Sequence, residues 1–339
     1  MKTLHKHLIL FSFILLSSVL HAQNKPAAKA LINQGIALND SGKYIEAIAK
    51  YQEALRKDTS NLQALYEMSY TLSISGKPKD AIPYLEKVAS TNTYPEAYDL
   101  LASIYDDEHD FVKSVSYYKL GIIAFPDYQR LRFNLGISYL RQKMYPEAEQ
   151  AAIKAIELNP KHASSHRLYA LATYAQDKRG MSLLAWCSFL LLEPQTKRSA
   201  EGYKYVDKLI NYGITKTGEK SIVMSVSAKD TEGPNFLMPI SVIAATSDKV
   251  GLSRADSLAL QLKSIFEISE RFAGKTRDSF YTTFFSDYFK NLVSSNNMPA
   301  FARFISVAAY QEDNLKWFKE NGAQLKALQD WSANTKREL

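Results

Sequence analysis

The chain has 339 residues, of which 46% are hydrophobic, 23% charged and 12% aromatic. This composition excludes an intrinsically disordered chain, a collagen-like fibre and a disulfide-stapled miniprotein. The net charge of +7 is mild and spread over many acids and bases, so nucleic acid is not expected as a partner. The single cysteine, Cys187, excludes an internal disulfide and a cysteine-based metal site.

The chain begins with a segment typical of a secretory signal peptide. Lys2 and Lys6 precede an apolar run over residues 8–20, and Ala22 offers a small residue at the cleavage position. A helix over this run would span about 20 Å, short of the roughly 30 Å hydrocarbon core, so a cleaved leader is favoured over an anchor. We expect residues 1–22 to be removed and the mature protein to be periplasmic or secreted in a Gram-negative bacterium, without stable membrane insertion.

A repeat of about 34 residues organises the next part of the chain. The tripeptide Ser41-Gly42-Lys43 recurs 34 residues later, beginning at Ser75. The same register predicts repeats over residues 28–61, 62–94, 95–128, 129–162 and 163–196. One small residue occupies the same position in each: Gly35, Ser69, Ala102, Gly136 and Ala170. Prolines recur in phase where a second helix must end: Pro126, Pro160 and Pro194.

In this register the chain resembles the tetratricopeptide repeat (TPR) family, in which each repeat is a pair of antiparallel helices. The fourth repeat matches best, with Leu135, Gly136 and Tyr139 in its first helix and Ala148 in its second. The resemblance implies an all-α fold in which about five helix pairs stack into a right-handed superhelix. A single repeat cannot bury its apolar face, so the repeats are stable as an array.

The resemblance also implies a binding surface, because the first helices of this family line a concave groove. Carried over position by position, the groove contains Ile32, Ile36, Tyr66, Tyr70, Asp99, Ser103, Asp106, Arg130, Phe133, Ile137, Arg141, Arg167 and Tyr174. These residues combine an apolar and aromatic band with an acidic patch in the third repeat and arginines in the fourth and fifth.

The repeat phase is lost after Pro194. Residues 197–212 read as an amphipathic helix that caps the fifth repeat. Residues 213–253 are rich in glycine and proline and predict a loop-rich connection, with a short helix near residues 238–246 favoured over a β-hairpin. Ser253 then opens a helix, and residues 254–339 predict an all-helical module.

One helix of this module carries a continuous aromatic face at helical spacing. Its members are Phe280, Tyr281, Phe284, Phe285, Tyr288 and Phe289. We expect them to form the core of the C-terminal half. The alternative is an exposed docking surface for a partner or lipid.

The sequence carries few signs of a metal site or a catalytic site. His162 and His166 are four residues apart, but no carboxylate follows them at a spacing that would complete a metal site. The acidic run over residues 106–110 lacks the glycine and spacing of a calcium loop. Phosphate-binding loops, dinucleotide fingerprints and G-x-S-x-G motifs are absent from the sequence. We therefore predict no catalytic residue, metal or cofactor.

These observations favour an exported, non-catalytic scaffold that holds a segment of an unidentified protein or peptide, with envelope assembly or secretion as candidate settings. Tyr70 and Phe133 would supply apolar burial, and Arg130, Arg141 and Arg167 would supply orientation. One alternative is a structural or oligomerisation protein that uses the aromatic C-terminal face. A third is an enzyme with an unrecognised C-terminal domain. Neither the partner nor the oligomeric state follows from the sequence.

Overall fold

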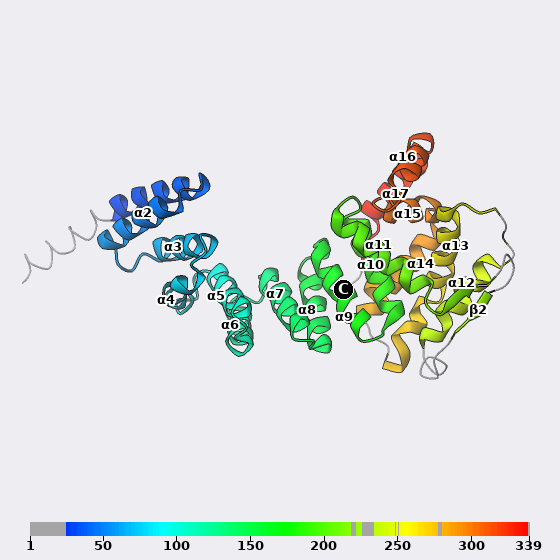
Figure 1. Cartoon of the computed structure of the whole chain (residues 1–339), viewed down its shortest axis with the longest axis horizontal. Helices are drawn as coiled ribbons and strands as arrows, with labels where there is room; N and C mark the ends of the chain where they lie inside the picture. The colour runs from blue at the N-terminus through cyan, green and yellow to red at the C-terminus, as the bar shows by residue number, and fades with distance from the viewer. Residues whose placement is uncertain are drawn as a thin grey trace, which may run out of the picture. The chain divides into compact units, whose positions relative to one another are not determined.

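A computed structural model describes residues 25–217, 222–225, 234–247, 249, 251–276 and 280–337 (Figure 1). These residues are overwhelmingly helical, which confirms the predicted all-α fold class. The leader predicted at residues 1–22 lies outside the described residues. Within them, no helix is both long and apolar enough to cross a membrane. The chain divides after Asn134 into two compact units, and each is described by itself.

The first unit is built from consecutive helices that pack in pairs. They are a helix over residues 25–40, α2 (Tyr44–Lys57), α3 (Leu62–Ile74), α4 (Pro78–Ala89), α5 (Pro95–Asp107), α6 (Phe111–Ala124) and the start of α7 (Gln129–Arg141). The helices α3, α5 and α7 begin at the residues where the sequence repeats begin. Asn61 caps α3 by accepting a hydrogen bond from the Ala64 amide (3.0 Å), and proline occupies the first turn of α4 and α5.

The Ser-Gly-Lys tripeptides form the turns inside the first two repeats. Gly42 and Gly76 have φ angles of +76° and +83°, a left-handed conformation that glycine adopts without steric cost. The amide of Lys43 then donates to the carbonyl of Leu38 (2.9 Å), which satisfies a carbonyl at the end of the first helix. The motif is therefore a helix stop.

Close helix crossing explains the small residue in the first and fourth repeats. A Cβ atom placed on Gly35 would lie 2.4 Å from the fully buried ring of Tyr51, and one on Gly136 would lie 2.6 Å from Leu168. A larger side chain at either position would push the two helices apart.

The second unit continues the repeats and adds the C-terminal module. Its repeat part contains the end of α7, α8 (Tyr145–Leu158), α9 (Ala163–Ala175), α10 (Arg179–Leu192) and α11 (Lys197–Ile210). There follow β1 (Ile214–Lys216), β2 (Ile222–Met224), η1 (Pro234–Phe236), α12 (Leu237–Thr246), α13 (Arg254–Glu267), η2 (Ser269–Thr276), the π-helical η3 (Tyr281–Ser286), α14 (Asp287–Ser294), α15 (Met298–Ile305), α16 (Gln311–Glu320) and α17 (Gly322–Asn334).

Helix and hairpin both occur in the connection. The expected short helix near residues 238–246 is confirmed by α12. The hairpin lies earlier, where β1 pairs antiparallel with β2 and Thr215 lies opposite Val223. The β-branched residues of β2 therefore form a strand, whereas the run that follows Pro239 is helical.

Helix α10 is the centre of the second unit. Residues 179–190 are all buried, because α9 and α11 pack on it together with η2, η3 and α15 of the C-terminal module. A helix that is apolar all round needs such a complete cover. Gly180 lies at the contact between α10 and η2, since a Cβ atom there would lie 2.2 Å from the Phe272 ring.

The aromatic face of η3 and α14 is buried, as expected for a core. Phe285 stacks on Tyr169 of the fifth repeat with ring centroids 5.3 Å apart, and Phe289 stacks on Phe266 of α13 at 4.6 Å. The core of the C-terminal half thus continues onto the last repeat. The alternative of an exposed docking face is wrong, and the oligomerisation hypothesis loses the surface on which it was based.

Candidate protein-binding surfaces

In the first unit, α3 and α5 differ in charge from the second helices. The first helices α3 and α5 carry five carboxylates and no lysine or arginine. These carboxylates are Glu67, Glu96, Asp99, Asp106 and Asp107. The second helices α2, α4 and α6 carry seven lysines and arginines against four acids. The start of α7 instead carries Arg130 and Arg132, so the excess of negative charge belongs to α3 and α5. Glu67, Glu96 and Asp107 reach the surface there, whereas Asp99 and Asp106 are buried.

Tyrosines lie among these carboxylates. The rings of Tyr66 and Tyr94 stack in parallel with centroids 5.7 Å apart. Burial, followed by the charges of Glu96 and Glu67, raises the pKa of Tyr66, and burial with the charge of Glu96 raises the pKa of Tyr128. We call this surface the tyrosine–carboxylate face: Tyr66, Glu67, Tyr94, Glu96, Asp99, Tyr128 and Arg130.

Asp99 and Arg130, predicted separately, form one cluster on this face. Asp99 is only 3% exposed; it forms an ion pair with Arg130 Nε (2.8 Å) and accepts a hydrogen bond from Asn134 Nδ2 (2.6 Å). Burial raises the pKa of Asp99, and the two donors oppose that shift. The Arg130 side chain remains 64% exposed, so the cluster holds a cation at the surface.

The other predicted positions of the first unit differ in exposure. Tyr70 is 41% exposed, and Ile36 and Phe133 are half-buried. Asp106 is buried, and Ile32 is only 1% exposed, so Ile32 belongs to the core and cannot line an inner wall. The sequence reasoning missed Ile74, which is 43% exposed one helical turn after Tyr70.

The predicted positions of the second unit are partly engaged by α11. Arg167 Nη2 contacts Glu201 Oε2 at 3.4 Å, and the Tyr174 ring meets Tyr205 edge to face at 5.1 Å. Ile137 is half-buried and Arg141 is exposed. The capping helix therefore covers part of the surface that α9 would otherwise offer.

His166 and Cys187 serve packing. His166 is fully buried, and its ring nitrogens lie 2.9 Å from the Pro160 carbonyl and 2.8 Å from Ser188 Oγ. Burial, aided by the charge of Arg337, lowers the pKa of His166 to about 3. Burial raises the pKa of the Cys187 thiol. Within the described ranges, no three His, Cys, Asp or Glu side chains are grouped as metal ligands would be.

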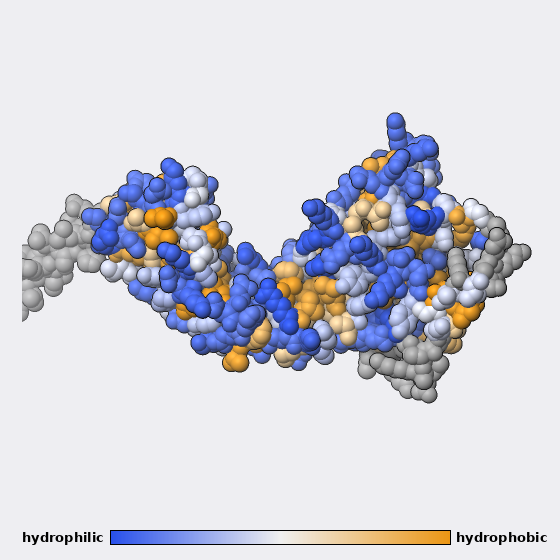
Figure 2. Space-filling view, viewed as in Figure 1, coloured by the Kyte–Doolittle hydropathy of each residue, from blue (hydrophilic) through white to orange (hydrophobic). Residues whose placement is uncertain are grey.

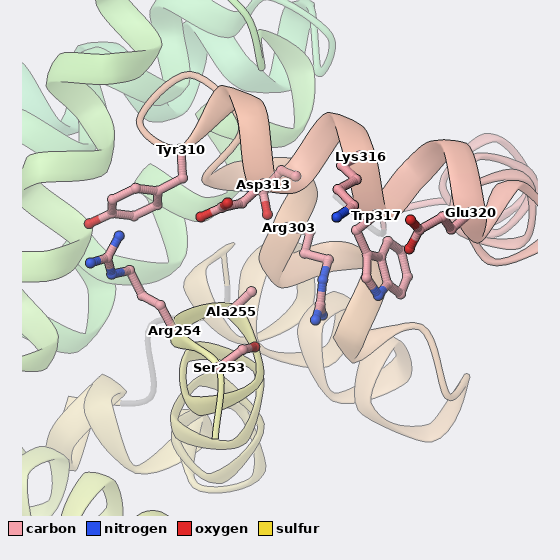
Figure 3. Close-up of a pocket in the computed structure, with 10 residues that line it drawn as sticks. Ser253, Arg254, Ala255, Arg303, Tyr310, Asp313, Lys316, Trp317 and Glu320 are labelled. Carbon is pink, nitrogen blue, oxygen red and sulfur yellow. The ribbon is translucent and has the colours of Figure 1, made fainter. Parts of the chain in front are cut away.

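A pocket that the sequence did not indicate lies between the start of α13 and α16 (Figure 3). Its volume is about 400 Å³. The guanidinium of Arg254 lies 4.2 Å from the centre of the Tyr310 ring, and that of Arg303 lies 4.3 Å from the Trp317 ring. Asp256 binds Arg303 Nη2 at 2.7 Å. Lysine, aspartate and glutamate side chains also line this pocket, so its charges are mixed.

Comparison with known families identifies the repeats. Models of the tetratricopeptide repeat match residues 15–61 and 130–162. The chain therefore carries tetratricopeptide repeats, as its resemblance to that family implied. A search of the curated proteins finds no match.

Several solved structures resemble part of the chain. One is the MamA protein, with 20% identity, 56% of this chain and 98% of that chain covered, and a TM-score of 0.44. Another is YrrB, titled a TPR protein with an unusual peptide-binding site, with 18% identity, coverage of 51% and 90%, and a TM-score of 0.43. A third is PilF of Pseudomonas aeruginosa, with 16% identity, coverage of 56% and 90%, and a TM-score of 0.43.

Proposed function

We propose that the protein is an exported, non-catalytic adaptor that holds a segment of a partner protein against the first helices of its repeats. Tetratricopeptide repeats act as protein-interaction modules, which supports this role at the level of the family. The observation that carries the proposal is the tyrosine–carboxylate face, next to which Tyr70 and Ile74 expose apolar surface on α3.

This face combines the two features that a protein-binding surface needs. Tyrosine rings offer large contact areas and lose little conformational entropy when they are covered. Apolar area removed from water contributes about 25 cal/mol per Å², so Tyr70 and Ile74 can supply affinity. The surrounding charges set the register and orientation of the bound segment. In Figure 2 the visible surface of the first unit is largely hydrophilic, with patches of hydrophobic residues exposed among the hydrophilic ones.

Site-specific photo-crosslinking in the native host tests the proposal. A photoreactive phenylalanine analogue at Tyr70 is expected to capture a partner protein. The same analogue at Val112, which is 84% exposed on the second helix α6, is the matched control. Capture at position 112 and none at position 70 would show that the partner binds the second helices instead.

A double substitution tests the contribution of the apolar side chains. Replacing Tyr70 and Phe133 with alanine is expected to abolish capture of that partner while the helical circular dichroism signal is unchanged. Unchanged capture would transfer the binding role to the C-terminal half.

Export is the second part of the proposal and rests on the leader over residues 1–22. Cell fractionation should recover the protein outside the cytoplasm, and mass spectrometry of its N-terminus should find Gln23. An intact Met1 in a cytoplasmic fraction would overturn this part and leave the binding role untouched.

A further inference from the structure

We infer that the segment bound by the first unit is positively charged: lysine or arginine side chains alternate in it with apolar ones. This inference rests on the proposed function, because it names the chemistry of the partner for the same face. The juxtaposition that carries it is the set of Glu67, Glu96 and Asp99 around the Tyr66–Tyr94 stack.

The carboxylates on this face have other negative charges nearby. Burial, together with the negative charge of Asp40, raises the pKa of Glu67. Glu96 adds its charge to the surroundings of Tyr66, Tyr128 and Asp99 alike. A cation placed beside Glu67 or Glu96 would be attracted to that carboxylate, whereas an anion would be repelled.

Arg130 shows how such a cation is held. Its Nε lies 2.8 Å from the buried Asp99, and its charge also acts on Tyr66 and Tyr128. A guanidinium or ammonium group therefore already has a carboxylate and tyrosines as neighbours at one point of the face. Glu67 and Glu96, both half-buried, offer further acidic contacts on the same helices.

The apolar part of the inferred segment follows from Tyr70 and Ile74. They lie one turn apart on α3 and are 41% and 43% exposed. A segment with apolar side chains between its cations would cover both residues while its charges reach the carboxylates. Its attraction to the face would weaken with salt, because exposed charge pairs are screened.

Fluorescence anisotropy with two labelled peptides and the purified mature chain tests the inference. In the first peptide lysine alternates with leucine, and in the second glutamate replaces every lysine. The lysine peptide is expected to bind, with an affinity that falls as salt is raised, and the glutamate peptide is not. The Glu67→Gln, Glu96→Gln double variant should bind the lysine peptide roughly tenfold more weakly at low salt, because two surface charge pairs are lost.

The matched control is the Glu46→Gln, Glu53→Gln double variant, which removes the same charge from the second helix α2. It should bind like the parent chain. Equal affinity for both peptides, no binding of the lysine peptide, or an equal loss in both double variants would overturn the inference. Crosslinking at Tyr70 tests the proposed function separately. Capture of an acidic segment there would support the proposed function and refute the positive charge inferred for the bound segment.

Discussion

Single residues control how closely neighbouring helices of this protein pack against each other. Gly180 is the sharpest case, since a Cβ atom there would lie within 2.2 Å of Phe272, whereas one on Gly322 would meet nothing within 4 Å. His166 is another, because its imidazole is buried between the fifth repeat and the aromatic rings of Phe284 and Phe285. Both residues lie where the repeats meet the C-terminal module.

We predict that Gly180→Ala lowers the free energy of unfolding by about 1–3 kcal/mol, because it overpacks the contact with Phe272. Urea unfolding followed by circular dichroism measures the effect. Gly322→Ala is the control and should leave stability unchanged or slightly higher. Equal stability of the two variants would mean that Phe272 does not pack on α10.

We predict that His166 makes the protein less stable in acid. Its pKa is about 3 in the folded chain and about 6.5 when unfolded, so between pH 6.5 and pH 3 this proton binds mainly to the unfolded state. The free energy of unfolding should therefore fall as the pH is lowered from 6.5 towards 3, by about 1.4 kcal/mol per pH unit.

Urea unfolding at pH 7.5 and pH 5.0 measures this dependence. The parent chain should lose about 2 kcal/mol more than the His166→Asn variant over that interval. His109→Asn is the control, since His109 is exposed and asparagine tolerates its φ of 61°. If the free energy of unfolding of His166→Asn fell between pH 7.5 and pH 5.0 as much as that of the parent chain, His166 would not be the group that destabilises the protein in acid.

The elements show why some repeats were easier to predict than others. In the first two, Gly42 and Gly76 adopt the left-handed turn, and the same turn is made later by His109, Lys143 and Asp177. These residues take positive φ at a modest cost, so the turn persists where its sequence signature is lost. The repeat boundaries were predictable because small residues and prolines recur at a fixed spacing in the sequence. The hairpin β1–β2 was harder to predict, because strands of three residues are too short to show a clear alternation of polar and apolar side chains.

At the same scale, Pro83 lies inside α4 with an exposed ring, and its backbone nitrogen has no hydrogen to donate. Pro83→Ala should raise the free energy of unfolding by about 1–3 kcal/mol, measured by urea unfolding. Pro78→Ala is the control, because proline costs nothing in the first turn of a helix. A loss of stability in Pro83→Ala would show that the ring makes a contact the helix needs.

At the scale of the whole molecule, the two units should respond independently to local damage. Repeats contact mainly their neighbours in sequence, whereas α10 is enclosed by several elements of the C-terminal module. We predict that Gly35→Ala, which crowds Tyr51, speeds hydrogen exchange in α2 and leaves α10 unchanged. Gly180→Ala should speed hydrogen exchange in α10 and leave α2 unchanged. Faster exchange in both places in either variant would indicate one cooperative unit.

The binding surface was less predictable than the fold. The repeat register placed Tyr70, Asp99 and Arg130 on first helices, but the Asp99–Arg130 pair joins residues of different repeats and follows only from three-dimensional packing. Ile32 was assigned to the groove because its repeat position is usually exposed there, yet it is buried. The pocket beside Arg303 could not be foreseen, because the paired Asp256 lies 47 positions earlier in the chain.

The burial of α10 has an evolutionary consequence. In an open solenoid, duplication can add units at either end, since the last surface is free to receive another. Here the flank that a new unit would need is already taken by α11 and the C-terminal module. Growth of this array by duplication must therefore occur upstream of the fifth repeat, and homologues of greater length should carry their extra units there.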